Sequence, residues 1–144
     1  MAGIQRTSAA RALARKLALQ ALYSAQINER PWQDLIGEFA GDEDMPRADR
    51  EYFDTLVRSV CETRAALDEA LVPFLNVKPA QLDAVEHAVL WIAAHELKHE
   101  LHVPFRVVIN EAVGLCKRFG ATDGHKFVNA VLDRAARDWR PNEH

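Results

Sequence analysis

The chain of 144 residues contains only two cysteines and six glycines, and it has no long uninterrupted apolar segment. Cys61 and Cys116 lie far apart and form no CxxC pair, so both are expected to be reduced thiols on helix faces. No run approaches the roughly 18 apolar residues that a membrane-spanning helix needs. The basic N-terminus is followed by no apolar core or cleavage pattern of an export signal. These absences predict one cytoplasmic domain, residues 1–144, without membrane association.

Acidic residues are missing from the start of the chain, although the formal net charge is −3. The first acid is Glu29, and four cations precede it: Arg6, Arg11, Arg15 and Lys16. A local excess of positive charge is typical of a binding site for a polyanion. Residues 29–69 contain twelve acids and five bases, which we interpret as a solvated acidic surface. Such a surface would repel nucleic acid and confine it to one face of the molecule.

Apolar spacing and helix-start signals predict an all-α fold. Apolar residues recur at helical spacing in six segments, which begin near Thr7 or Ser8, Pro31, Pro46, Pro79, Phe105, and Thr122 or Asp123. Pro73 suits the end of the third segment, and Gly120 suits a left-handed C-cap of the fifth. No segment shows the alternation that is typical of a strand bounded by turns.

The first predicted helix has two distinct faces. A stripe of alanine and leucine around Leu17 is expected to be buried. A second line of side chains, each four residues apart, lies on a different side: Arg11, Arg15, Leu19 and Tyr23. Guanidinium groups neutralise phosphates, and an aromatic ring stacks on unpaired bases, so this line suits single-stranded RNA. The alternative is a solvated helix face with Tyr23 half-buried against a neighbour.

The segment HELKH at residues 95–99 matches the HExxH pattern of zinc hydrolases. Two histidines four apart on a helix face the same way and hold zinc while the glutamate acts as base, and His102 would be a third ligand. The extended form of the motif is absent, and histidine and lysine are favoured near a helix C-terminus through the helix dipole alone. We therefore expect no enzyme activity, metal or cofactor, and a zinc hydrolase remains an alternative that would use His95, Glu96 and His99.

Several short blocks along the chain form a recognisable set, which reads, in order, QALY at 20–23, VPF at 103–105, INEA at 109–112, KRFG at 117–120, HKFVN at 125–129 and VLD at 131–133. This set resembles the NusB family of bacterial transcription antitermination proteins. The resemblance covers nearly the full chain without large gaps, and HKFVN is its most specific block. It implies an all-α fold of about six to seven helices arranged as two small helical bundles, without catalytic activity.

The resemblance also implies a function and partners. Members of the family bind the boxA element of ribosomal RNA leader transcripts together with NusE, which is also a small-subunit ribosomal protein. The complex joins RNA polymerase and the other Nus factors and suppresses premature termination. Similar domains occur in ribosomal RNA cytosine methyltransferases, so an accessory RNA-binding module of such an enzyme is an alternative. A homodimer in which the first helix faces itself is a further expectation.

Carried over position by position, the family's arginine-rich RNA-binding motif falls on Arg6, Arg11, Arg15 and Lys16. Ala12 and Leu13 stand where some relatives continue the arginine run, which implies weaker RNA binding by the isolated protein. The remaining RNA-binding positions are Gln20, Tyr23, Phe119, Asp123, Lys126 and Phe127, and the NusE side is assigned to Tyr23 and Glu86. Each has a structural alternative: the phenylalanines as core, Asp123 as a helix cap and Glu86 as a solvated charge.

Overall fold

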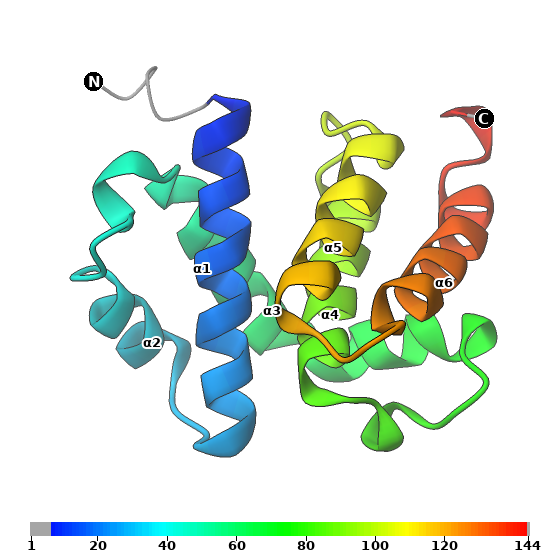
Figure 1. The fold of residues 1–144 in the computed structure, drawn as a ribbon, viewed down its shortest axis with the longest axis horizontal. Coiled ribbons are helices and arrows are strands. Elements are labelled where there is room, and N and C mark those ends of the chain that lie inside the picture. Colours follow the sequence, from blue (N-terminus) through cyan, green and yellow to red (C-terminus); the bar gives the residue numbers. More distant parts are fainter. Residues whose placement is uncertain (1–6, 144) are drawn as a thin grey trace. The chain divides into compact units, whose positions relative to one another are not determined.

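The structure, a computed structural model, describes residues 7–143, and within that range it contains helices and no strand. The six α-helices of the described range are α1 (Ser8–Ile27), α2 (Trp32–Phe39), α3 (Arg50–Leu71), α4 (Ala84–His99), α5 (Phe105–Phe119) and α6 (Gly124–Trp139) (Figure 1). Short 3₁₀ turns occur at Met45–Arg47, Val72–Phe74, Pro79–Gln81 and Pro141–Glu143. The all-α prediction is confirmed. None of the described helices combines the length and apolar character needed to cross a membrane.

The chain forms two compact units, as expected for two small helical bundles. The N-terminal unit ends at Glu62 and contains α1, α2 and the first part of α3. The C-terminal unit begins at Thr63 and contains the rest of α3 with α4, α5 and α6. The backbone of Thr63 has φ −129° and ψ 17°, outside helical values. The boundary between the units therefore coincides with an interruption inside α3.

In the N-terminal unit, α1 packs against α2 (Figure 1). The hydroxyl of Thr7 accepts a hydrogen bond from the amide of Ala10 at 3.1 Å, which confirms the predicted N-cap. The buried face of α1 contains Ala10, Ala14, Leu17, Ala18 and Ala21. Because most of these side chains are alanine, neighbouring segments approach the α1 backbone closely.

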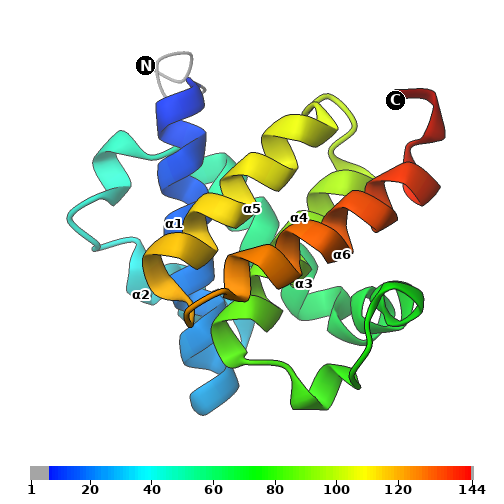
Figure 2. The same cartoon turned by 45° about the vertical axis from the view of Figure 1, so that its right-hand side comes forward.

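In the C-terminal unit, α4, α5 and α6 pack against one another in pairs (Figure 2). Every residue of α4 from Glu86 to Leu97 is buried, so this helix forms the centre of the unit. Asp68 in α3 accepts hydrogen bonds from the His87 ring at 2.7 Å and from the Trp91 indole at 2.8 Å. This partly buried acceptor holds the second part of α3 against α4.

Gly120 follows α5, but the left-handed C-cap predicted for it is wrong. Its backbone is extended, with φ −91° and ψ 179°. A Cβ atom at this position would lie 2.8 Å from the carbonyl oxygen of Cys116. Glycine is therefore required by close backbone contact at the end of α5, and not by a positive φ angle.

Candidate nucleic-acid interface

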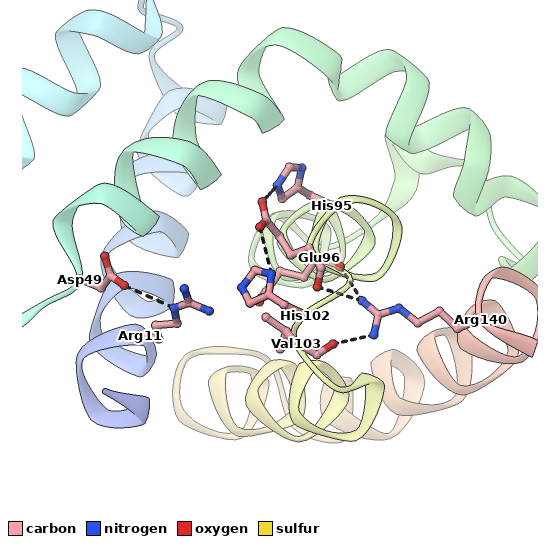
Figure 3. Close-up of polar contacts among 8 residues, drawn as sticks. Arg11, Asp49, His95, Glu96, His102, Val103 and Arg140 are labelled. Carbon is pink, nitrogen blue, oxygen red and sulfur yellow. Dashed lines mark hydrogen bonds and ion pairs between the residues drawn. The ribbon is translucent and has the colours of Figure 1, made fainter. Parts of the chain in front are cut away.

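Arg11 lies near the start of α1, where the sequence predicted a phosphate contact. Its guanidinium donates a hydrogen bond to Asp49 at 3.3 Å (Figure 3) and lies over the ring of Tyr52, 4.3 Å from the centroid. Asp49 also accepts a hydrogen bond from the amide of Tyr52 at 3.0 Å, so one acid holds both the cation and the start of α3. Arg11 remains partly exposed, with its position fixed by an acid and an aromatic ring.

Arg15 lies one turn further along α1 and does not form the exposed line that the i, i+4 spacing predicted. Only 3% of its surface is exposed, and Leu19, the next member of the line, is also buried. The Arg15 guanidinium lies 5.6 Å from the centroid of the Tyr52 ring. A delocalised cation stacks favourably on an aromatic face, which stabilises it away from water. The prediction that Arg15 and Leu19 belong to a solvent-facing ladder is therefore wrong.

Lys16 forms an ion pair with Asp44, which also pairs with Arg47. The hydrogen bond from Lys16 lowers the pKa of the Asp44 carboxyl, and the positive charge of Arg47 lowers it further. Asp44 and Asp49 bind cations of α1, so these two acids are exceptions to the interpretation of residues 29–69 as a solvated acidic surface. The guanidinium of Arg11 and the ammonium of Lys16, which a phosphate would contact, are therefore already paired with these two carboxylates.

The C-terminal half of α1 is more open. Tyr23 is 39% exposed and Ile27, one turn later, is 72% exposed, while Gln20 is half-buried. An exposed tyrosine beside an exposed isoleucine gives a mixed aromatic and apolar surface suited to a base or to a partner protein. Arg6, the first cation of the predicted motif, lies outside the described residues.

Four predicted RNA contacts occur at the end of α5 and the start of α6. Asp123 is exposed and has a positive φ angle of 67°, a conformation that aspartate adopts more readily than most residues. It occupies the N-cap position of α6 without a side-chain capping hydrogen bond and pairs with exposed Lys126 at 3.3 Å. Phe119 and Phe127 are half-buried, so each ring contributes both to packing and to the surface. These residues share one short segment of the C-terminal unit.

Glu86 in the first turn of α4 is buried, so the alternative reading of a solvated charge is wrong. Burial raises the pKa of its carboxyl, and the nearby negative charge of Asp83 raises it further. Asp83 caps α4 by accepting hydrogen bonds from the amides of Val85 and Glu86. A Cβ atom at Gly124, the first residue of α6, would lie 2.5 Å from Glu86 Oε2. The glycine thus leaves room for this carboxyl.

Cys116 is buried in α5, and the two cysteines form no disulfide. Burial raises the pKa of the Cys116 thiol to about 12, and the charges of Glu86 and Asp83 act in the same direction. Because the thiolate is the reactive form, we expect iodoacetamide at about pH 8 to modify half-buried Cys61 and to leave Cys116 unmodified in the folded protein. Peptide mass spectrometry measures this, with guanidinium-unfolded protein as the control. Modification of Cys116 at a rate similar to Cys61 would contradict the prediction.

The HExxH residues at the end of α4 are engaged in packing. The His95 ring forms a hydrogen bond with the Glu100 carboxylate at 2.9 Å, and His102 lies 3.8 Å from the other oxygen of Glu100. The rings of His95 and His99 are 5.4 Å apart. Within residues 7–143, no group of three or more histidine, cysteine or acidic side chains has an arrangement that could hold a metal ion. The geometry gives no support to the zinc alternative.

The sequence interpretation missed residues that fix the site. Asp44, Asp49 and Tyr52 hold the cations of α1, yet they come from a segment interpreted as solvated. The contacts join residues about 30 to 40 positions apart, which a helical period does not reveal. Arg140 was also missed; an arginine beside Pro141, directly after an amphipathic helix, was the available signal. It is buried and donates to main-chain carbonyls at the end of α4 and to that of Val103 in the connection to α5 (Figure 3).

Comparison with known proteins gives consistent matches. The model of the NusB family matches residues 12–137. The transcription antitermination protein NusB of Stenotrophomonas maltophilia is 47% identical over 133 residues, covering 92% of this chain and 84% of the relative. The protein of the same name from Idiomarina loihiensis is also 47% identical, covering 92% of this chain and 96% of the relative. A solved structure of T. maritima NusB aligns with a TM-score of 0.80 at 30% identity, covering 89% of this chain and 91% of that chain.

Proposed function

This chain belongs to the NusB family, and we propose on that basis that it acts in transcription antitermination by binding boxA RNA of ribosomal RNA leader transcripts together with NusE. The family match along residues 12–137 carries the proposal, because it includes α1 from Lys16 through Tyr23 as well as the segment from Phe119 to Phe127. In this function the protein is an adaptor between RNA and the transcribing polymerase with its other Nus factors, and it catalyses no reaction.

We assign the RNA backbone to the partly exposed cations of α1. Arg11 and Lys16 would exchange the carboxylates of Asp49 and Asp44 for phosphates, so binding follows from competition between two kinds of anion. Arg15 has a supporting role, because its buried guanidinium holds Tyr52 under Arg11. Arg6 is also proposed to contact the RNA backbone, and this assignment rests on the sequence alone.

We assign base contacts and the protein partner to the remaining predicted residues. Tyr23, Phe119 and Phe127 present aromatic surface for stacking, while Gln20, Asp123 and Lys126 supply polar groups for base edges or phosphates. NusE is proposed to contact Tyr23 with the exposed side chain of Ile27, and the start of α4 at Glu86. Because Glu86 is mostly buried, its contribution would come mainly through placing neighbouring groups.

The proposal is tested by titrating a boxA RNA and a scrambled RNA of equal length with the protein, in the presence and absence of NusE. We expect weak binding by the protein alone and a large gain with NusE that is limited to boxA. Equal binding of both RNAs in the presence of NusE would refute the assignment to boxA. Light scattering of the same samples shows whether the protein alone is a homodimer and whether RNA separates it.

Replacing Asp44 by asparagine is expected to strengthen binding of boxA RNA by about two- to fivefold, because Lys16 and Arg47 lose a competing carboxylate. Fluorescence anisotropy with labelled RNA at fixed salt measures the effect. Glu43→Gln is the matched control, since it removes the same charge at an exposed neighbouring position. If both variants changed affinity equally, net charge and not the Lys16 pair would be responsible.

A further inference from the structure

A pocket of about 330 Å³ lies between α2 and α3 in the N-terminal unit, and its lining includes none of the α1 cations that were assigned to RNA. The two helices give the pocket one apolar and one polar wall. One side of the pocket is apolar and comes from α2, and the other is polar and comes from the first turns of α3; the lining residues are Trp32, Ile36, Glu51, Asp54, Thr55 and Arg58. A pocket of this size suits one side chain or a small molecule.

Asp54 gives this pocket an unsatisfied acceptor. Its Oδ1 atom is shielded from solvent and has no hydrogen-bond partner among residues 7–143. Burial raises the pKa of the Asp54 carboxyl and the charge of Glu51 raises it further, whereas Arg50 acts in the opposite direction. Buried acceptors normally have a donor, and a lone one is costly. Because half-buried Asp54 also lines the pocket, a turn of its carboxyl would bring this oxygen to a donor on a ligand.

The other lining residues indicate the charge and shape of the ligand that would bring this donor. Glu51 adds a second carboxylate, while the cation of the wall, Arg58, lies 3.8 Å from Glu62 and shares its charge with that acid. Trp32 is half-buried and offers an aromatic ring to a cation, and Ile36 offers a surface to an aliphatic stem. Together these walls match an alkyl chain that ends in a planar, multiply donating cation.

We propose that the pocket between α2 and α3 receives an arginine side chain from a partner protein. In this arrangement the guanidinium donates to Asp54 and Glu51 and stacks near Trp32, and the methylene groups pack on Ile36. Arginine fits better than lysine, because its fixed fork reaches two carboxylates at once while its flat face remains available to the indole. An inserted arginine that is desolvated among aromatic and acidic groups is typical of an anchor residue in a protein interface.

The test uses small probes and the full chain. N-acetyl-arginine methylamide carries the side chain without charged backbone ends, and the corresponding citrulline compound is its neutral isostere. We expect the arginine probe to shift the Trp32 indole N–H resonance in a saturable manner at millimolar concentration, and the citrulline probe to produce no saturable shift. Asp54→Asn is expected to weaken the arginine probe at least tenfold, whereas Glu43→Gln, an equal charge change outside the pocket lining, leaves binding unchanged.

Three results would overturn the proposal: no Trp32 shift with the arginine probe, equal shifts with the two probes, or spermidine binding at Trp32 as tightly as the arginine probe. The last result would assign the pocket to free polyamines. If Asp54→Asn loses the dispersed spectrum of the folded protein, Glu51→Gln replaces it in the same comparison. Because boxA RNA is absent from these experiments, their outcome is independent of the RNA-binding proposal.

Discussion

Replacing Arg140 by alanine is expected to lower the free energy of unfolding by about 3–5 kcal/mol. Arg140 is only 5% exposed, and its guanidinium donates to the carbonyl oxygens of Leu97, Val103, Glu96 and Glu100 at distances from 2.6 to 3.2 Å. The last carbonyls of a helix lack partners within the helix and form its negative end. Arg140 satisfies this end of α4 with both hydrogen bonds and positive charge, so alanine would leave buried acceptors unpaired.

Urea unfolding followed by far-ultraviolet circular dichroism and tryptophan fluorescence measures the change. Arg137→Ala is the control: this arginine is 69% exposed in its side chain, pairs with Asp133 within α6, and should change stability by less than about 0.5 kcal/mol. Arg140→Lys should lower the free energy of unfolding by an amount between those of Arg140→Ala and Arg137→Ala. One ammonium keeps the charge but does not reach the same set of carbonyls. A loss below about 1 kcal/mol for Arg140→Ala would contradict the assigned role.

Removing the two partly exposed cations of α1 together is expected to weaken boxA binding about tenfold near physiological salt. Each phosphate contact with single-stranded nucleic acid contributes about 0.7 to the slope of log affinity against log salt concentration. Arg11→Gln with Lys16→Gln should therefore lower the magnitude of that slope by about 1.4. Arg15 is left intact, because its buried stacking on Tyr52 would mix loss of folding with loss of binding.

The measurement is RNA-binding anisotropy in the presence of NusE over a series of salt concentrations. Lys78→Gln with Arg137→Gln removes the same charge from exposed positions outside α1 and should leave the slope unchanged. Circular dichroism confirms that both double variants keep their helices. Identical slopes for the α1 double variant and the unmodified protein would remove α1 from the RNA-binding surface.

Local signals predicted the helices well. Thr7 caps α1 as its hydroxyl suggests, and α5 begins at Phe105 directly after Pro104. Pro31 is the N-cap of α2, one residue before the predicted helical position, and α4 begins at Ala84 after a 3₁₀ turn that starts at Pro79. Caps and prolines act within a few residues, so a sequence contains the information that places them.

Burial was harder to predict, because it depends on which segment packs beside a helix. The spacing of Arg11, Arg15 and Leu19 describes one helix side, but it does not reveal that Arg15 and Leu19 are buried. Nor does it reveal that Tyr52 packs beside Arg11 and Arg15. In α4 the polar residues His87, His95 and Glu96 are also buried, which the helical spacing of its apolar residues does not reveal. Buried polar side chains with distant partners carry no periodic signal.

The carboxylates of Asp44 and Asp49 have a consequence for which anions α1 can accept. Both acids belong to the same chain as the cations, so they act as tethered competitors whose effective concentration is high and does not change on dilution. A single phosphate or a short oligonucleotide would have to displace one of these carboxylates at each cation separately. In the proposed RNA-binding function, a longer strand that engages several cations at once would gain from its own connectivity and displace the carboxylates. The ion pairs would thereby set a threshold that discriminates among polyanions by length and charge density.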